Sequence, residues 1–393
     1  MNSAPLQNGA DDAVELIFLG TGTSSGLPHV DCLTAPPDAT PCHTCLSTLK
    51  PEGKKNIRRN TSAVFRVKGR DGRKRTIVVD VGKTFQAAAL EWFPKYGLRR
   101  IDAVLITHAH ADAMNGLDDL RGWTLRQAIQ PHVDVYVSQA TFTEVIRSFP
   151  YLVSKEYASG GGDVPDFKWH IIDDRVPFEI EDTGIEITPF SVHHGRIFST
   201  APPPAYIPTP TGTAPSSPPD SGRITPLHPK EPSVNGAKKI HPYLCLGFKI
   251  QNEVIYLSDV SHIPEDTWDF LERSSDSPGP SRGLPILVLD CLRLLPHTSH
   301  LGVKESIAMA RRFNAQRTYL TGFGHEVSQE EYVAMCEAVG GKTEHLLTPS
   351  PNIQEGLELI EEGEAIWVRP AYDGLRVFIP GDGDSIHDEG YDG

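Results

Sequence analysis

The chain has 393 residues, of which 39% are hydrophobic and 22% charged, which is ordinary for a soluble protein with a sizeable core and one or two domains. The formal net charge of −14 argues against nonspecific binding to nucleic acid or to anionic membranes, although it leaves room for a local basic pocket that holds a phosphate. No apolar run approaches the length of a transmembrane helix and no signal peptide is visible, so we expect a reducing compartment, the cytoplasm or the nucleus. The six cysteines are then expected to be metal ligands or core residues rather than disulfides.

The N-terminal part begins with a polar stretch, residues 1–12, that we expect to be disordered. The apolar run 14–19 predicts a strand, which leads into a turn of small residues over 20–28 where the backbone can approach a ligand or another loop closely. This turn is not a dinucleotide-binding fingerprint, because Pro28 blocks the helix that would have to follow. It also lacks the Gly-Lys-Ser/Thr of a phosphate-binding P-loop.

Three cysteines follow this turn. Cys32 precedes Cys42 and Cys45, whose Cys-x-x-Cys spacing suggests zinc or redox chemistry, and the proline-rich surroundings and the third cysteine favour zinc. A structural zinc site is closed and four-coordinate, so a fourth ligand is needed. His43 is a local candidate and His325 a distant one.

The next part of the chain mixes predicted strands and helices. Strands are predicted over 62–67, 76–80 and 133–137, helices over 85–96 and 141–149, and a helix or helical turn over 117–129. Two basic clusters flank the first of these strands, and we interpret both as solvated loop charge rather than binding patches. They are Lys54, Lys55, Arg58 and Arg59 before it, and Arg70, Arg73, Lys74 and Arg75 after it.

A buried strand over 101–106 ends in three side chains that can bind a metal ion. Its apolar residues lead directly into His108, His110 and Asp112. In an extended chain alternate residues point to the same side, so both imidazoles can face one ion and Asp112 can follow. Zinc, manganese and iron accept imidazole and carboxylate ligands, so this stretch predicts a metal site.

The second half of the chain continues the alternation around two low-complexity stretches. The proline-rich residues 199–240 are interpreted as a disordered insertion within one domain, and 274–283 as a flexible loop. Strand ends bear His or Asp at 193, 194, 259 and 290, which suggests a layered α/β protein with a metal site at one edge. Strands are predicted over 169–172, 185–190, 243–250, 254–259, 285–290, 317–321, 365–368 and 375–379, and helices over 267–273, 303–313 and 329–339.

The order of these elements resembles the metallo-β-lactamase superfamily, especially the branch of the phosphoribosyl cyclic-phosphate phosphodiesterases. The resemblance is carried by the turn 18–28, the cysteine cluster, the segment 107–112, the Leu-Ser-Asp at 257–259, the loop 290–300 and the strand 319–325. It implies an α/β fold in which two mixed β-sheets pack face to face with helices outside. That fold would form a single domain over 13–380, followed by a polar tail over 381–393.

The resemblance also implies the metal ligands. One catalytic position would be complete, because its ligands are all present: His108, His110, His194 and Asp259, with His193 as a competing neighbour of His194. The second position would keep Asp112 and Asp259 but lose two histidines, since Ala113 and Gly322 stand in their places. The structural zinc would use Cys32, Cys42, Cys45 and His325.

We therefore expect a mononuclear hydrolase with one catalytic divalent metal, zinc rather than manganese, acting on a small phosphodiester or cyclic phosphate. Asp112 would accept the proton of the attacking water, His297 or His300 would protonate the leaving group, and Asp80 would orient a metal-binding histidine. The alternatives are a thioester, lactone or ester hydrolase of the same fold, and a catalytically inactive binding or scaffold protein. The expected partner is a small-molecule substrate, with neither nucleic acid nor membrane, and the oligomeric state is left open.

Overall fold

The computed structural model describes residues 12–197, 241–273, 283–343, 348–381 and 385–392. The segments expected to be disordered or flexible, 1–12, 199–240 and 274–283, lie outside the described residues, except for Asp12 and Gly283. Within the described residues, no helix combines the length and the apolar character that crossing a membrane requires.

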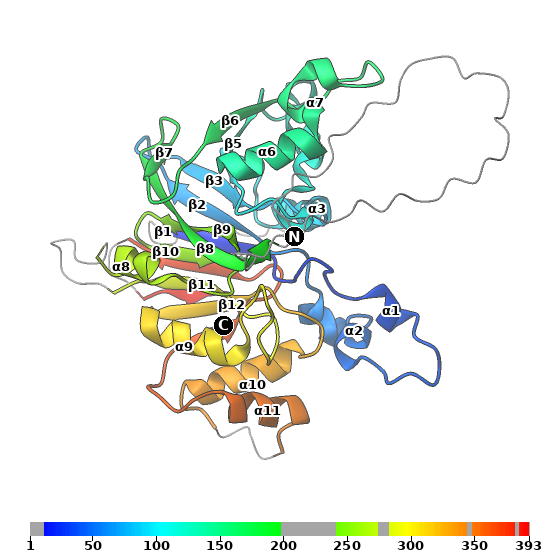
Figure 1. Cartoon of the computed structure of the whole chain (residues 1–393), viewed down its shortest axis with the longest axis vertical. Coiled ribbons are helices and arrows are strands. Elements are labelled where there is room, and N and C mark those ends of the chain that lie inside the picture. Colours follow the sequence, from blue (N-terminus) through cyan, green and yellow to red (C-terminus); the bar gives the residue numbers. More distant parts are fainter. Residues whose placement is uncertain (1–11, 198–240, 274–282, 344–347, 382–384, 393) are drawn as a thin grey trace, which may run out of the picture.

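Two β-sheets packed face to face form the centre of the molecule (Figure 1). The first has the strand order β15-β14-β1-β2-β3-β4-β5-β6 and is antiparallel up to β3 and parallel from β3 to β6. Its strands are β1 (Asp12–Gly20), β2 (Ser62–Lys68), β3 (Lys74–Val79), β4 (Ala103–Leu105), β5 (Val133–Val137), β6 (Phe167–Ile171), β14 (Arg376–Pro380) and β15 (His387–Asp388).

The second sheet has the order β13-β12-β11-β10-β9-β8-β7, parallel from β10 to β13 and antiparallel from β7 to β10. Its strands are β7 (Phe178–Ile180), β8 (Ile185–Ile197), β9 (His241–Ile250), β10 (Val254–Leu257), β11 (Ile286–Asp290), β12 (Arg317–Thr321) and β13 (Val368–Pro370). The expected α/β sandwich of two mixed sheets with helices outside is confirmed.

Three apolar layers hold the sandwich together. The inner layer joins side chains of both sheets, such as Leu16 and Phe65 from the first and Phe248 and Tyr256 from the second. Two outer layers pack the far face of each sheet against helices. The central strands therefore bury both faces, which explains why β4, β5 and β11 appear in the sequence as continuous apolar runs rather than alternating ones.

Helices cover both outer faces, and the short helices α1 and α2 project from the body as a separate lobe (Figure 1). The first sheet is covered by α3 (Phe85–Lys95), α6 (Gln139–Ser148) and α7 (Pro150–Val153), and the second by α8 (Glu265–Arg273), α9 (Val303–Phe313), α10 (Gln329–Val339) and α11 (Pro351–Leu359). The remaining helical segments are α1 (Val30–Leu33), α2 (His43–Ser47), α4 (Ala111–Met114), α5 (Arg121–Thr124), and the 3-10 turns η1 (Pro51–Asn56), η2 (Leu117–Leu120), η3 (Leu125–Gln127) and η4 (Lys155–Tyr157).

The structure refines three expectations from the sequence. The segment 117–129, expected as a helix or helical turn, forms short helical turns, because Arg126 and Gln127 have positive φ angles of 51° and 55°. The strand expected over 365–368 begins only at Val368, where it pairs with Thr318 of β12. The polar tail 381–393 adds β15 to the first sheet, where buried Asp388 accepts a hydrogen bond of 2.7 Å from the Tyr319 hydroxyl.

The first basic cluster is a further correction, because it is not simply solvated. Arg58 is only 1% exposed, and its guanidinium donates to the backbone carbonyls of Gly324 and Val327, the latter at 3.0 Å. Its planar group also lies over the ring of Phe323, with 5.1 Å to the ring centroid. A buried cation is tolerated here because carbonyl oxygens of one loop replace its water.

Candidate functional site

The expected site residues follow strands whose ends meet along one edge of the sandwich. Asp80 follows β3, and His108 and His110 follow β4, which is parallel to β3. From the second sheet, His194 lies in β8 and Asp259 follows β10. The amide of Leu246 in β9 donates 2.9 Å to the carbonyl of Thr107, which joins the two sheets beside the site.

Three histidines converge at this edge, and we call His108, His110 and His194 the histidine triad. Each offers a ring nitrogen, and these nitrogens all lie within 4.8 Å of one another. His110 Nδ1 is 3.2 Å from His194 Nε2, and the ring centroid of His108 lies 4.6 Å from that of His110. Three converging imidazoles are a ligand set that a divalent ion such as zinc accepts.

Hydrogen bonds orient the rings of His194 and His108 toward the point where the ring nitrogens of the triad converge. The Nδ1–H of His194 donates to the backbone carbonyl of Ser299 at 2.8 Å, which leaves Nε2 as the free acceptor. The Thr107 hydroxyl donates to Asp80 Oδ2 at 2.8 Å, so it accepts from His108 Nδ1, also at 2.8 Å. The Nε2 of His108 is buried and has no hydrogen-bond partner among the described residues. An orphaned buried acceptor is costly unless something occupies it, so the donor set fits a metal ion.

Asp80 acts on the triad through Thr107 rather than by direct contact. Its carboxylate accepts 2.8 Å hydrogen bonds from both the amide and the hydroxyl of Thr107. Asp80 is 1% exposed and adopts a left-handed backbone with φ of 60°. Burial raises the pKa of this carboxyl well above its usual range, whereas burial lowers the pKa of His108 to about 3. His108 is therefore neutral, the state a metal ligand requires.

Asp259 and His300 form the next layer of the site. The ligand atoms of His194, Asp259 and His300 lie within 4.8 Å of one another. Burial lowers the pKa of His300, but its ion pair with Asp290, 3.0 Å from Nδ1 to Oδ2, outweighs burial and raises the pKa to about 9. Burial alone would raise the pKa of Asp259, but the neighbouring histidines, including the protonated His300, lower it to about 2.

Three expected residues stand apart from these groups. Asp112 is partly exposed and accepts a hydrogen bond of 2.7 Å from the Ser24 hydroxyl. His297 is exposed and lies 2.9 Å from the Ser299 hydroxyl, so His300 is the histidine of that loop that reaches the triad. His193, the competing neighbour, instead has its ring centroid 5.3 Å from that of His262.

The two substituted positions of the second metal site are both buried. Ala113 is 1% exposed, and its carbonyl accepts a 2.8 Å hydrogen bond from the Val81 amide. Gly322 has a φ of 81°, and a Cβ placed on it would lie 2.5 Å from Asp290 Oδ1. The carboxylate of Asp290 therefore occupies the space that a larger residue at position 322 would need.

One residue of the site was missed from the sequence. Tyr243, at the start of β9, stacks on His110 with ring centroids 4.7 Å apart and planes at 6°, and its hydroxyl accepts 3.2 Å from the Ala109 amide. These two contacts hold the more exposed ring of the triad. No motif marks Tyr243, because its distance along the chain from His110 gives no local signal.

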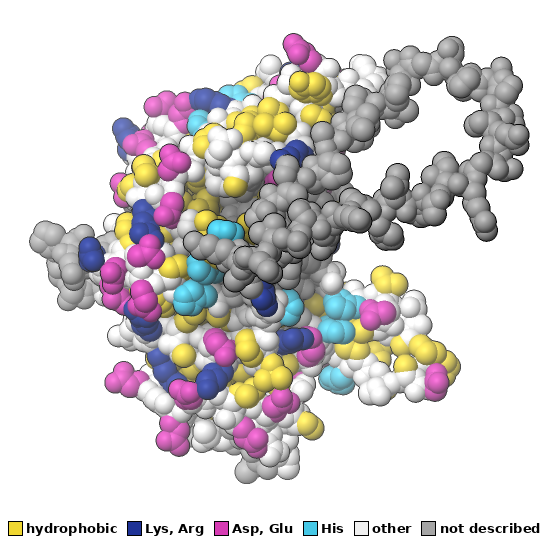
Figure 2. Space-filling model, in the orientation of Figure 1, with side chains coloured by type: hydrophobic (Ala, Val, Ile, Leu, Met, Phe, Trp, Pro, Cys, Tyr) yellow, Lys and Arg dark blue, Asp and Glu magenta, His cyan; other side chains and the backbone are white. Residues whose placement is uncertain are grey.

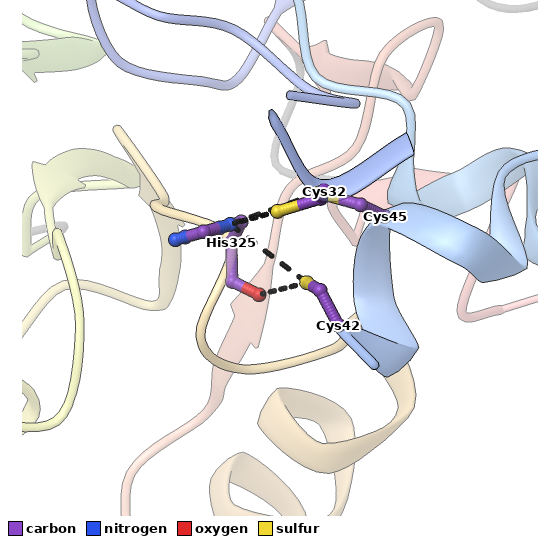
Figure 3. Close-up of side chains that lie close together, drawn as sticks. All are labelled: Cys32, Cys42, Cys45 and His325. Atoms are coloured by element: carbon purple, nitrogen blue, oxygen red, sulfur yellow. Dashed lines mark hydrogen bonds between the residues drawn. The ribbon is translucent and has the colours of Figure 1, made fainter. Parts of the chain in front are cut away.

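A second cluster joins the projecting lobe to the second sheet (Figure 3). The side chains of Cys32, Cys42 and Cys45 point toward His325, and their sulfur atoms lie 3.2, 3.7 and 3.7 Å from its Nδ1. The alternative ligand His43 is exposed and outside this group. Burial and the neighbouring thiols raise the pKa of Cys32 to about 12, so three thiolates at this spacing require a cation between them.

The two clusters are separate. Figure 2 shows histidines gathered near the middle of the face in view, and others where the lobe of α1 and α2 joins the body. Arg58 stabilises the loop that carries His325. Its guanidinium donates to the carbonyls of Gly324 and Val327, which lie on either side of His325 in the chain. Of these two clusters, the cysteine cluster is a closed set of sulfur and nitrogen ligands, which is typical of a structural site, and the triad with Asp259 is a more open set of nitrogen and oxygen ligands.

Comparisons with known proteins agree with this architecture. The family profile "Beta-lactamase superfamily domain" matches residues 75–207. A crystal structure of a diphosphatase from the PhnP family is similar, with a TM-score of 0.57 and 21% identity over 92% of this chain and 96% of that chain. The metallo-β-lactamase fold protein YhfI from Bacillus subtilis has a TM-score of 0.49 and 13% identity, over 93% of this chain and 99% of that one. At 21% identity, the likeness to the diphosphatase concerns the fold alone.

A curated relative matches only in part. An octanoyltransferase of Porphyromonas gingivalis is 31% identical over 181 residues, which make up 46% of this chain and 31% of the octanoyltransferase. This chain thus spans less than a third of the length of the curated relative it matches.

Proposed function

We propose that this chain, whose residues 75–207 match the beta-lactamase superfamily domain, is a metal-dependent hydrolase of a small phosphodiester or cyclic phosphate. The proposed centre is mononuclear and consists of the histidine triad with Asp259. The observation that carries the proposal is the buried, unpartnered Nε2 of His108, which lies where the other two triad nitrogens converge. A protein with no use for an ion would have little reason to bury such an atom.

A divalent ion held there, zinc rather than manganese, would supply Lewis acidity that activates water and polarises a phosphoryl oxygen. Residues of the chain would then accept and donate the protons that the reaction transfers. Asp112, whose carboxylate is oriented by the Ser24 hydroxyl, would accept a proton from the attacking water. His300, kept protonated by Asp290, would donate a proton to the leaving oxygen.

The preference for a phosphoryl substrate is supported by the charge at the centre and by the diphosphatase with the same fold. A protonated His300 beside a cation suits an anionic substrate, since both charges attract phosphoryl oxygens. Hydrolysis of an ester or thioester needs no such second positive group. The partial match to an octanoyltransferase is a reason to test acyl substrates as well. It covers too little of that protein to favour them over phosphoryl substrates.

Elemental analysis and turnover together test the proposal. We expect about two ions per chain in the native protein, one in each cluster, and about one in the double variant His108→Ala with His110→Ala. The matched control His262→Ala removes an exposed histidine outside the triad and should keep both ions. A small cyclic phosphodiester should be hydrolysed by the native protein and the control, but not by the double variant.

Other results would overturn specific parts of the proposal. Three ions per chain in the native protein would mean that the second catalytic position still binds metal. One ion in both the native protein and the double variant would favour a binding or scaffold protein. Loading of the centre with turnover of a thioester or lactone, and none of the phosphodiester, would assign an acyl substrate instead.

A further inference from the structure

A cleft of about 550 Å³ lies on the side of the first sheet opposite the histidine triad. It opens at the amino-terminal ends of β3 and β4, whereas the triad follows the carboxyl end of β4. The six residues from Asp102 to His108 correspond to roughly 20 Å of extended chain, so the cleft is separate from the metal centre. We call it the basic cleft, because six of its lining side chains are cations: Arg66, Arg73, Lys74, Arg75, Arg99 and Arg100.

Nearby carboxylates neutralise only part of this charge. Glu15 pairs with Arg66 and Lys74. Asp71 pairs with Arg73 and Arg75, and Asp102 pairs with Arg75 and Arg100. Six cations against three carboxylates leave an excess of three positive charges in a protein whose net charge is −14. Such a local concentration of positive charge is unfavourable unless an anion relieves it.

One arginine of the basic cleft has its guanidinium free for a ligand. No carboxylate among the described residues lies within ion-pair distance of Arg99, whose side chain is exposed at the cleft. Arg75 contributes charge rather than a free donor, because its terminal nitrogens face Asp71 and Asp102 and its Nε is buried. Guanidinium groups bind phosphate oxygens through paired N–H donors, so Arg99 within this excess of positive charge suits a ligand that carries several negative charges, such as a phosphorylated one.

We propose that the basic cleft binds a small anion with at least two linked phosphate groups, such as the diphosphate of a nucleotide. The charge excess matches a diphosphate better than a single phosphate, and the volume falls within the range of small-molecule sites. A nucleic-acid backbone fits less well, because Asp71 and Asp102 interrupt the basic surface and the rest of the protein is acidic. This site is independent of the hydrolytic function proposed above.

The test is calorimetric titration of the full-length protein with inorganic pyrophosphate and with ADP. The cleft variant is Arg73→Glu with Arg99→Glu, which changes two exposed side chains and leaves the paired Arg66 and Arg75 intact. The control variant, Arg126→Glu with Arg273→Glu, makes the same change in net charge at exposed sites outside the cleft. A third protein, the double variant of His108 and His110, lacks two ligands of the metal centre.

We expect the cleft variant to lose at least about tenfold in affinity for pyrophosphate, while the control and the triad variant bind as the native protein does. Affinity should also fall as salt is raised from about 50 to about 300 mM. Equal binding by the cleft variant, or loss of binding only in the triad variant, would overturn the proposal. So would the absence of binding in the native protein, or tighter binding of a 20-base-pair DNA duplex than of ADP.

Discussion

The substitution Gly322→Ala tests the proposal that Asp290 takes the place of a second catalytic metal position. Gly322 has a φ of 81°, where any side chain is strained, and its added Cβ would lie 2.5 Å from Asp290 Oδ1. Gly97 provides a matched control, because it has a φ of 62° but nothing within 4 Å of an added Cβ. Both variants therefore carry the backbone strain, and only the first also displaces a carboxylate.

The magnitudes can be separated. Left-handed backbone costs an L-residue roughly 1–2 kcal/mol, part of which is offset because alanine reduces the entropy of the unfolded chain. Displacing Asp290 weakens its charged hydrogen bonds to His300 and to the Leu301 amide, which contribute roughly 1.5–3 kcal/mol each. We therefore expect Gly322→Ala to lower the free energy of unfolding by about 2 kcal/mol or more beyond the loss in Gly97→Ala.

Denaturant unfolding at fixed metal content measures this difference, and elemental analysis of Gly322→His completes the test. The histidine variant should be at least as destabilised as the alanine variant, and it should bind no additional ion, because its imidazole must compete with the Asp290 carboxylate for the same space. If Gly322→Ala were no less stable than Gly97→Ala, or if Gly322→His bound a third ion per chain, the argument from Asp290 would be refuted.

Three further predictions concern the structural cluster, the triad and pH. Cys45→Ser should bind about one ion fewer per chain and melt at a lower temperature, whereas His43→Ala should match the native protein in elemental analysis and in thermal unfolding. Asp80→Asn should lower kcat about 10- to 100-fold with an unchanged circular dichroism spectrum, because Thr107 then finds one acceptor oxygen where the carboxyl group of Asp80 offers two; wild-type kcat would contradict this role. Burial raises the pKa of Asp373 from 3.8 to about 7, so its contribution to stability is complete below pH 3.8 and is lost as the pH rises through 7. Unfolding free energies at pH 5 and pH 8 should therefore differ by about 3 kcal/mol more in the native protein than in Asp373→Asn, because about two pH units separate pH 5 from this pKa. Equal differences in the two proteins would show that Asp373 does not cause the pH dependence.

Local patterns in the sequence were enough to predict every observed strand except β7 and β15, and to identify the first two triad histidines. An apolar run that ends in two histidines at alternate positions needs no tertiary information, and the structure places His108 and His110 where that pattern predicts. His194 and His325 were assigned only through the resemblance to a family. Each lies far along the chain from its partners, so the convergence depends on how the strands are ordered in the sheets.

The interpretation of charge from sequence was less successful. Arg58 belongs to a basic cluster that seemed solvated, yet it is buried because the loop around His325 supplies carbonyl acceptors from the other end of the chain. Tyr243 was missed for a similar reason, since its stacking on His110 depends on the pairing of β8 with β9 and on the packing of one sheet against the other. Both cases depend on long-range contacts, which the periodicity of the local sequence does not reveal.

The loss of the second metal position has a physical basis that the sequence alone does not reveal. Asp290 ends β11 and pairs in register with Thr321 of the parallel strand β12, so the residue after that threonine, Gly322, lies directly beside the Asp290 carboxylate. The same carboxylate holds the protonated ring of His300. His300 thus places a positive charge next to Asp259, which would let the proposed mononuclear centre attract and polarise an anionic substrate.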